Sequence, residues 1–371
     1  MKILFIAPRF HTNQFPIIKF LKKKNHVYFL SQYLGDVENY TIIKPVLCKG
    51  IFFPLNFDFK NIEYSTSSFL PNIFFLIKFF KKINPDLIII RHQYKLLSYI
   101  CIFLLKLMKK KILIYDQNEI SLNVKKKILN YIWFKSEFYF RTYILNIPWF
   151  SPINNYKNKK IRKNCYFLPF AVENNFKSKN INTRNKIRIL SIGKFRERKN
   201  FLLLCKSIKL LNDNYDMQFE VLLVGQVKTE EEKNHYKKVK NYIKKNNLLN
   251  IIKIEINIPH HLIGSYYKKS DLFVLPSTRE PAAISVLEAA SYGLPVIISN
   301  TSGTRCYFKN NYNAKFFLDQ NEVDLKNKIL FFIKNPKKLI LFRKNLMKKF
   351  EETMSIQNYE KKFEKILQKS K

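Results

Sequence analysis

The chain has 371 residues, of which 47% are hydrophobic, and its formal net charge is +40. A chain of this length is expected to form two domains, and its apolar content excludes an intrinsically disordered protein. The five scattered cysteines form no C-x-x-C pair, which argues against a disulfide framework or a metal site and favours a reduced, cytosolic protein. The most apolar run, Leu96 to Met108, is too short to cross a bilayer and predicts a core or interfacial helix.

The positive charge is spread evenly along the sequence, with no basic tail or arm. Lys, Asn, Ile, Phe and Tyr are abundant while Gly is scarce, and the abundant residues share AT-rich codons, so much of the lysine excess is expected to be solvated surface. Such a surface is still drawn to anionic membranes and nucleic acids. We expect peripheral contact with an anionic membrane and no specific binding to nucleic acid.

The first half of the chain alternates apolar runs of strand length with helical patterns. Its first residues, up to Pro8, are too short for the core of a signal peptide and predict a strand. Further strands are predicted at 27–30, 87–90 and 112–115, and helices at 17–21, 72–82 and 94–109. This alternation is typical of the α/β class with parallel strands.

Three polar residues follow predicted strands of the first half and are candidates for ligand contact. They are His11, His92 and Asp116. In open α/β sheets, ligands bind outside the carboxyl ends of the strands, which favours a role for these residues in a site. The alternative is that each belongs to an ordinary surface loop, because loops are polar in any case.

The stretch 128–145 mixes aromatic side chains with Lys and Arg. A buried core helix is the favoured interpretation, and a helix lying among lipid headgroups is the alternative. Residues 147–151 and 165–168 are predicted as the last strands of the first domain. The Asn- and Lys-rich segment 174–186 is the predicted linker.

The second half opens with a strand at 187–192, followed by Gly193, a basic loop with Lys194 and Lys199, and a helix at 201–211. We call residues 193–200 the phosphate loop. A strand, a glycine, a basic loop and a helix start are the arrangement that binds phosphate groups through backbone N–H groups and ammonium groups. The alternative is a stray basic loop in a lysine-rich chain.

The stretch 273–299 predicts a strand, a loop, a helix up to Gly293 and a second strand. Gly293 suits a helix C-cap that requires a positive φ. Glu280 lies in the loop at the helix entrance and Glu288 about two turns into the helix, so the two side chains are not stacked on one face. The alternative is that Glu280 interacts with the helix dipole and that Glu288 is solvated.

Glu280 and Glu288, together with the run 293–297, resemble the E-x7-E motif of the retaining family 4 glycosyltransferases. The phosphate loop resembles the G-R-L-x-x-x-K-G loop of the same family. Lys199 stands at the place of the family's lysine and Lys194 at the place of its arginine, which keeps the charge but loses the bidentate fork.

The resemblance implies a GT-B fold, an α/β architecture of two Rossmann-like domains facing each other across a cleft. It implies transfer of a sugar, with retention of anomeric configuration, from a nucleotide diphosphate sugar to a glycan or lipid-linked acceptor. Gly193, Lys194 and Lys199 would bind the donor's diphosphate, Lys199 also stabilising charge that develops on it. Glu288 would bind the ribose hydroxyls, and Glu280 would contact the donor sugar and act with Lys199 as a catalytic residue. Neither a cofactor nor a metal is implied.

The resemblance also divides the chain. Residues 1–170 are expected to form the acceptor-side domain and residues 187–350 the nucleotide-sugar-binding domain. Residues 351–371 are expected to supply a C-terminal helix, capped by Ser355, that packs back across both domains. The expected location is the cytoplasm, at the inner face of the cytoplasmic membrane where the acceptor is lipid-linked.

Two departures from the family pattern leave other functions open. The first turn, 9–15, lacks the family's glycines, and Cys306 stands where the family has a glutamate. One alternative is a nucleotide-sugar epimerase on the same fold. The other is a non-catalytic basic protein, associated with membranes or nucleic acid, that retains a decayed transferase core.

Overall fold

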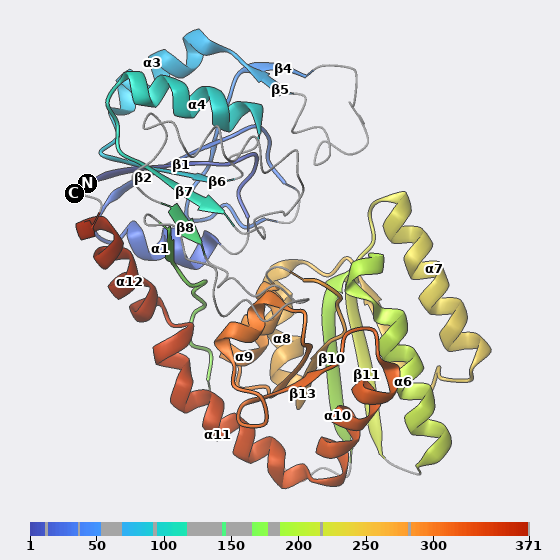
Figure 1. The fold of residues 1–371 in the computed structure, drawn as a ribbon. Coiled ribbons are helices and arrows are strands. Elements are labelled where there is room, and N and C mark those ends of the chain that lie inside the picture. Colours follow the sequence, from blue (N-terminus) through green and yellow to red (C-terminus); the bar gives the residue numbers. More distant parts are fainter. Residues whose placement is uncertain are drawn as a thin grey trace. The chain divides into compact units, whose positions relative to one another are not determined.

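The computed structural model describes residues 1–11, 14–35, 38–52, 69–91, 95–116, 143–145, 165–176, 186–215, 218–280 and 283–369. The chain forms two compact units, which are drawn in Figure 1. Among the described residues, unit 1 holds those up to 145, residues 165–171 and those from 359 onwards, and unit 2 holds residues 172–358. Each unit has a parallel sheet with helices packed on it, so the predicted α/β class is confirmed.

Unit 1 is built on seven parallel strands in the order β3-β2-β1-β6-β7-β8-β9. The strands are β1 (Lys2–Ile6), β2 (His26–Ser31), β3 (Val46–Leu47), β6 (Leu87–Arg91), β7 (Ile112–Asp116), β8 (Tyr143–Leu145) and β9 (Cys165–Phe167). Helices lie on both faces of this sheet in Figure 1, so β1 and β6 are buried almost throughout. Burial on both faces explains why their sequences are continuous apolar runs.

Three helices in the first part of unit 1 follow the predicted pattern. They are α1 (Phe15–Leu21), α3 (Ile73–Ile83) and α4 (Leu96–Leu107). The N-cap of α3 is Asn72, whose side chain accepts a hydrogen bond from the Phe75 backbone N–H at 2.9 Å, and its C-cap is Asn84 with φ 47°. The inner faces of α3 and α4 pack on β1, β6 and β7, while a short antiparallel pair, β4 (Gly50–Phe52) and β5 (Phe69–Pro71), lies beside them.

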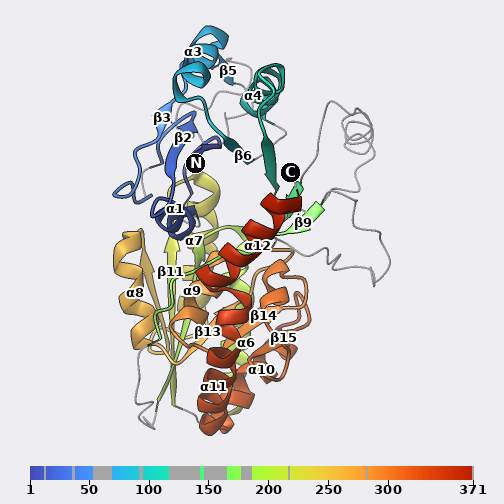
Figure 2. The ribbon, with the colours of Figure 1, turned by 90° about the vertical axis from the view of Figure 1, so that its left-hand side faces the viewer.

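The last helix, α12 (Ile356–Lys369), groups with unit 1 from Tyr359 onwards. The Ser355 hydroxyl accepts a hydrogen bond from the Asn358 backbone N–H at 3.1 Å, which confirms the predicted N-cap. Both Figure 1 and Figure 2 show α12 beside α1, and Lys24 pairs with Glu360 at 3.0 Å. The side chains that α12 buries have the spacing of one helix face: Tyr359, Phe363 and Ile366.

One predicted element of unit 1 is wrong in part. The helix expected at 128–145 does not reach its predicted end, because Tyr143–Leu145 forms strand β8 and pairs with β7. Tyr and Ile favour strands, and the open edge of β7 supplies the backbone partners. The rest of that stretch, the strand expected at 147–151 and most of the linker expected at 174–186 lie outside the described residues.

Unit 2 has six parallel strands in the order β12-β11-β10-β13-β14-β15. The strands are β10 (Ile187–Lys194), β11 (Phe219–Gln226), β12 (Ile252–Ile256), β13 (Leu272–Leu275), β14 (Val296–Ser299) and β15 (Ala314–Phe317). The chain builds outward from β10 to β12 and then returns to the other side of β10 with β13. Strands β10 and β13 therefore flank the point where the strand order reverses, which is where ligands bind in doubly wound sheets.

Helices cover the two faces of this sheet (Figure 1). They are α6 (Phe201–Asn214), α7 (Glu230–Lys245), α8 (His260–Lys269), α9 (Ile284–Ser291), α10 (Glu322–Lys334) and α11 (Pro336–Thr353). Helices α6, α7 and α10 bury their apolar side chains against one face, and α8 and α9 against the other. The alternation of inward and outward side chains along β10 and β13 serves both cores.

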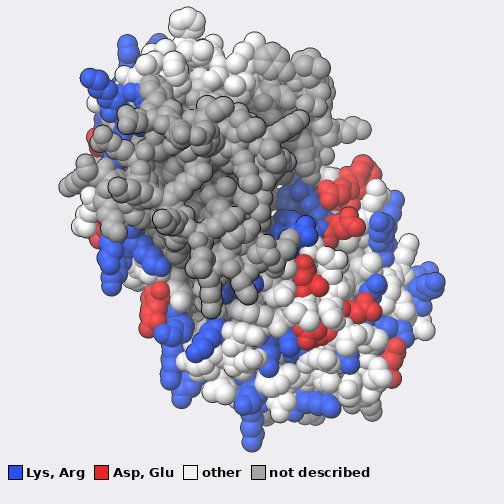
Figure 3. All heavy atoms as spheres, in the orientation of Figure 1, with Lys and Arg blue, Asp and Glu red and all other residues white. Residues whose placement is uncertain are grey.

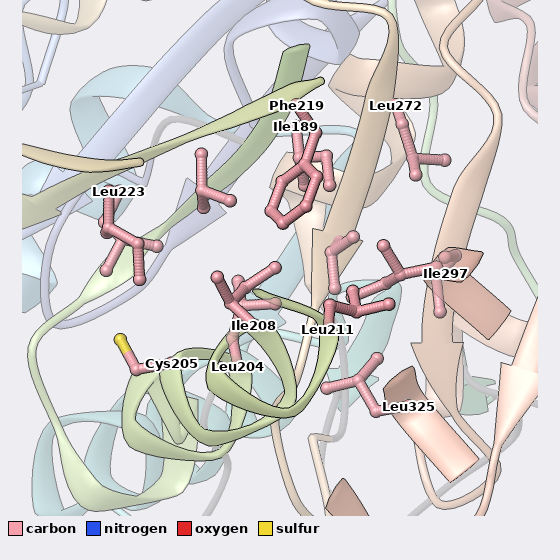
Figure 4. Packing of buried hydrophobic residues seen from close by; sticks show 14 of the residues in the cluster. Ile189, Leu204, Cys205, Ile208, Leu211, Phe219, Leu223, Leu272, Ile297 and Leu325 are labelled. Atoms are coloured by element: carbon pink, nitrogen blue, oxygen red, sulfur yellow. The ribbon is translucent and has the colours of Figure 1, made fainter. Parts of the chain in front are cut away.

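Figure 4 shows the larger core of unit 2 at close range. Leu204, Ile208 and Leu211 on α6 point toward Ile189 and Leu272 in the sheet, and all five are at least nine-tenths buried. Cys205 lies on the same helix. Among the described cysteines, Cys48, Cys101, Cys205 and Cys306 form no disulfide. Burial raises the pKa of Cys205 to about 12, so this thiol acts as an apolar core residue.

Candidate functional site

Two loops meet at the reversal point of unit 2. The phosphate loop leaves β10 and passes through a short 3-10 turn, η4 (Glu197–Lys199), before α6 begins. The second loop leaves β13 and leads to α9. The Thr278 backbone N–H donates a hydrogen bond to the Arg198 carbonyl at 3.0 Å, so the two loops are joined directly through their backbones.

Glu280 lies at the centre of this meeting point. Its Oε2 atom contacts the Lys199 ammonium at 2.5 Å and also forms an ion pair with the Arg198 guanidinium. The Glu280 side chain is 4% exposed. The predicted Lys199 and Glu280 therefore come together, and Arg198 joins them. The ion pairs contradict the alternative in which Glu280 serves only a helix dipole, and its side chain does not cap α9, which begins at Ile284.

The charges around Glu280 fix its protonation state. Burial by itself would raise the pKa of Glu280, but Lys199 and Arg198 lower that pKa to about 2. A lowered pKa means that the ionised form stabilises the fold above the unfolded-state pKa of about 4.3. This contribution is lost only as the pH falls toward about 2, so Glu280 is ionised at neutral pH.

Gly193 makes room for the Lys199 side chain. A Cβ atom at Gly193 would lie 3.2 Å from Cδ and 3.3 Å from Cγ of Lys199, closer than most side chains tolerate. The backbone of Gly193 has no positive φ, so its value here is close approach and not turn geometry. The glycine and the lysine of the predicted phosphate loop thus depend on each other.

A second acidic residue, Glu232 on α7, holds the phosphate loop through Arg196. The Arg196 Nε atom donates to Oε1 of Glu232 at 2.9 Å, and the Glu232 side chain is 1% exposed. Glu232 also accepts from the Thr229 backbone N–H at 3.3 Å, while the Thr229 hydroxyl accepts from the Glu232 N–H at 3.2 Å. This capping box at the start of α7 therefore also positions the phosphate loop.

Glu288 lies on α9 and is held by two residues of α8. Its Oε2 atom accepts a hydrogen bond from the Tyr267 hydroxyl at 3.0 Å, and its Oε1 atom lies 3.1 Å from Nε2 of His260. Burial, the nearby Glu288 charge and this hydrogen bond raise the pKa of Tyr267 well above its usual value, so its hydroxyl remains a donor. Glu288 is 20% exposed and has fixed partners, which contradicts the alternative of a freely solvated helix residue.

Four other residues were predicted from the sequence to contact ligand: Lys194, His11, Asp116 and His92. Lys194 ends β10 opposite Gln226 of β11. His11 lies in unit 1, where its backbone N–H donates to the Gln14 side chain at 3.0 Å. Asp116 ends β7, but its side chain lies outside the described residues, and so does the whole of His92.

The segment that contains Cys306 also touches the site. It forms a 3-10 turn, η5 (Gly303–Tyr307), and the Gly303 backbone N–H donates to the Glu280 carbonyl at 2.8 Å. Gly293 ends α9 with φ +77°, as its sequence position predicts. The family glutamate that Cys306 replaces would therefore belong to a turn that contacts the Glu280 backbone.

Sequence reasoning missed Arg198, Tyr267, His260 and Glu232 as site residues. Only Glu232 carried a readable signal, because Thr229 followed three residues later by Glu232 is a capping-box pattern. Among the described residues, no His, Cys, Asp and Glu side chains gather closely enough to hold a metal ion. No helix in the described part of the chain is both long and apolar enough to span a bilayer.

Comparison with known proteins gives matches to a family model and to two curated transferases. Residues 172–351 match the family model described as glycosyl transferases group 1. The UDP-Gal:alpha-D-GlcNAc-diphosphoundecaprenol alpha-1,3-galactosyltransferase of Escherichia coli is 36% identical over 94 residues, which cover 25% of this chain and 24% of that enzyme. The N,N'-diacetylbacillosaminyl-diphospho-undecaprenol alpha-1,3-N-acetylgalactosaminyltransferase of Campylobacter jejuni is 29% identical over 100 residues, covering 26% and 27%. The chain thus aligns with about a quarter of each relative.

Solved structures match over the whole chain. The Anabaena protein Alr3699/HepE in complex with UDP has a TM-score of 0.75 and 13% identity and covers 99% of this chain and 100% of that one. A glycosyltransferase from Rickettsia africae has a TM-score of 0.72 and 18% identity, and the match covers 100% of this chain and 98% of that one. At these identities the likeness shows the fold alone, and it confirms the predicted GT-B class with two Rossmann-like domains. The match to the glycosyl transferases group 1 model, over residues 172–351, covers nearly all of unit 2.

Proposed function

We propose that this chain is a glycosyltransferase that moves a sugar from a nucleoside diphosphate sugar to a glycan or lipid-linked acceptor, with retention of anomeric configuration. The observation that carries the proposal is the contact of Lys199 and Arg198 with Glu280 at the reversal point of a group 1 domain. Two cations in a loop that follows a strand suit a diphosphate, and a carboxylate beside them suits sugar hydroxyls.

The proposed roles follow from position in the site. Lys199 and Arg198 bind the diphosphate and offset the negative charge that grows on it as its bond to the sugar breaks. Glu288, held by Tyr267 and His260, accepts hydrogen bonds from the ribose hydroxyls. In a retaining transfer, the acceptor oxygen bonds to the anomeric carbon on the face that the diphosphate leaves, and a phosphate oxygen takes the acceptor's proton.

The relatives support the acceptor class. Both curated transferases carry names that specify an acceptor linked to diphosphoundecaprenol and an alpha-1,3 product linkage. We therefore favour a lipid-linked acceptor, which implies action at the cytoplasmic face of a membrane.

The test of the proposed function is a thermal-shift screen of nucleoside diphosphates and their sugars, followed by a transfer assay. A ligand present at 100 times its Kd should stabilise the protein by about 2.7 kcal/mol. Release of nucleoside diphosphate that requires an acceptor would support transfer. Conversion of the donor sugar without any acceptor would indicate an epimerase instead, and a protein that none of these ligands stabilises would indicate a non-catalytic role.

An exposed apolar group on unit 1 supports the proposed membrane contact. Ile51 on β4 lies opposite Leu70 on β5, and both are exposed. Ile73 and Phe74 follow in the first turn of α3, and Phe74 is 84% exposed. We call these four residues the apolar tip.

Lysines lie near the apolar tip in the sequence. Exposed lysines flank it on both sides in the sequence: Lys49, Lys78, Lys81 and Lys82. Figure 3 shows an uncharged surface at the top of unit 1, with Lys and Arg side chains next to it at the upper left. Exposed apolar side chains among lysines suit a layer of anionic lipid headgroups, where both kinds of side chain find partners.

Replacing one residue of the apolar tip should weaken membrane binding. We expect Phe74→Ser to lower the affinity for vesicles that contain anionic lipid by roughly tenfold, because a largely exposed Phe side chain gains apolar burial only in the lipid. Vesicle sedimentation measures this affinity, and added salt should release the wild-type protein because it screens the lysines.

The matched control is Leu249→Ser in unit 2, where the side chain is 60% exposed but lies away from the apolar tip in the sequence. It should bind vesicles as the wild type does. Equal binding of the wild type to neutral and anionic vesicles, or an unchanged affinity in Phe74→Ser, would contradict the proposed contact. Binding that nucleic acid displaces would indicate a general anion surface instead.

A further inference from the structure

One oxygen atom holds two cations at the proposed donor site. Oε2 of Glu280 forms ion pairs with both Lys199 and Arg198. Two positive side chains that contact the same atom repel each other, and an anion between them offsets this repulsion by attracting both. Glu280 is the acidic residue that supplies this anion from within the protein.

We propose that Glu280 occupies the place of a phosphate in the ligand-free site and that a diphosphate competes with it for Lys199 and Arg198. The proposal rests on the proposed function, because it assigns the diphosphate to the same two cations. It adds an exchange of partners: each cation leaves the carboxylate and binds phosphate oxygens when the donor enters.

Charge and exposure make the exchange favourable. A diphosphate brings at least two negative charges and several acceptor oxygens, whereas Glu280 offers one charge and one shared oxygen. The Arg198 side chain is 45% exposed, so its guanidinium can turn toward an incoming ligand while its fork binds two oxygens. The Lys199 side chain packs close to Gly193, so only its ammonium end has to turn from the carboxylate to a phosphate oxygen.

The exchange leaves Glu280 in need of new partners. Its side chain is 4% exposed, and a buried carboxylate without hydrogen bonds or ion pairs is costly. Hydroxyl groups of a donor sugar would supply hydrogen bonds, but a nucleoside diphosphate without its sugar would not. The site would therefore favour the intact donor over the product, and Glu280 would help to expel the product by taking back its two cations.

The test compares the binding of UDP and of inorganic pyrophosphate, measured by titration calorimetry. In Glu280→Gln the competitor loses its charge, so we expect both ligands to bind about tenfold more tightly than to the wild type. The matched control is Glu197→Gln, which removes one negative charge from an exposed residue of the same 3-10 turn. Its affinities should stay within about twofold of the wild type.

A second variant keeps the test decisive if Glu280→Gln fails to fold. Arg198→Gln changes an exposed side chain. It should lower the affinities for UDP and for pyrophosphate by a similar factor, because both ligands present phosphate oxygens. The gain from Glu280→Gln should also be smaller in the Arg198→Gln background, since one of the two exchanged cations is then missing.

The outcomes separate the exchange from the proposed function. If the wild type binds UDP and pyrophosphate but Glu280→Gln binds them no more tightly, or if Arg198→Gln binds both as the wild type does, the exchange is overturned while the donor site stands. If neither ligand binds the wild type or Glu280→Gln, the donor site itself is wrong, and the exchange falls with it.

Discussion

Lys199→Met is expected to lower the turnover number by about 100-fold or more, the loss typical of removing one group that stabilises developing negative charge. Methionine keeps an unbranched side chain against Gly193 but removes the ammonium that contacts Glu280 at 2.5 Å. The affinity for nucleoside diphosphate should fall as well, by about 1.5–3 kcal/mol, the value of a hydrogen bond to a charged group. Steady-state kinetics and calorimetry measure the two effects.

The matched control for this prediction is Lys194→Met. Lys194 belongs to the same phosphate loop and was predicted from the sequence to bind the diphosphate, but it ends β10 opposite Gln226. We expect a smaller loss of turnover there than in Lys199→Met. Full turnover in Lys199→Met, with the fold intact by circular dichroism, would contradict the assignment. Equal losses in the two variants would mean that the charge of the loop matters and not the contact with Glu280.

The sequence predicted the centre of the site because hydrophobic patterns placed two loops at one edge of a sheet. Buried runs at 187–192 and 273–275 indicated parallel strands, and the residues after them had to lie where those strands end. These patterns place Gly193, Lys199 and Glu280 in loops that follow strands, and the resemblance to the family 4 glycosyltransferases assigned all three to one donor site. Their ion pair follows from the adjacency of β10 and β13, which the reversal of strand order creates.

Residues that act by contacting other site side chains could not be predicted from the sequence. Arg198 is one of many basic residues in a chain with 67 Lys and Arg, so its type alone gave no signal. Tyr267 has the helical spacing of a core residue, and a sequence pattern does not show whether a buried tyrosine hydroxyl meets a carboxylate. Both assignments require the distance between residues far apart in the chain.

In unit 1 the fold could be predicted from the sequence but the ligand-binding residues could not. Its strand and helix order was predictable because β1, β6 and β7 each consist mainly of a continuous apolar run. Its candidate ligand residues were not, because any loop after a strand is polar. The prediction for His11 rested on such a loop, and its described backbone contact is with Gln14, a neighbour in the chain. Function on this side of the protein depends on loop conformations that periodicity does not encode.

Glu288→Gln is expected to weaken the binding of UDP about tenfold and to leave the binding of inorganic pyrophosphate unchanged. Glutamine still offers an acceptor oxygen to a ribose hydroxyl, but the hydrogen bond is no longer charge-assisted, which costs about 1–1.5 kcal/mol. Pyrophosphate has no ribose, so it contacts only the cations of the phosphate loop. Calorimetric titration of the same preparation with both ligands separates the two contributions.

Tyr267→Phe provides the matched positioning variant for that prediction. It keeps the ring that stacks on Tyr292 at 5.3 Å between centroids and removes only the hydroxyl that donates to Oε2 of Glu288. UDP should bind less tightly than to the wild type but more tightly than to Glu288→Gln, because the carboxylate remains and only its orientation is loosened. A loss of pyrophosphate affinity in either variant would show a general disturbance of the site. Unchanged UDP affinity in Glu288→Gln would remove Glu288 from the donor site, even in a protein that proved to be a transferase.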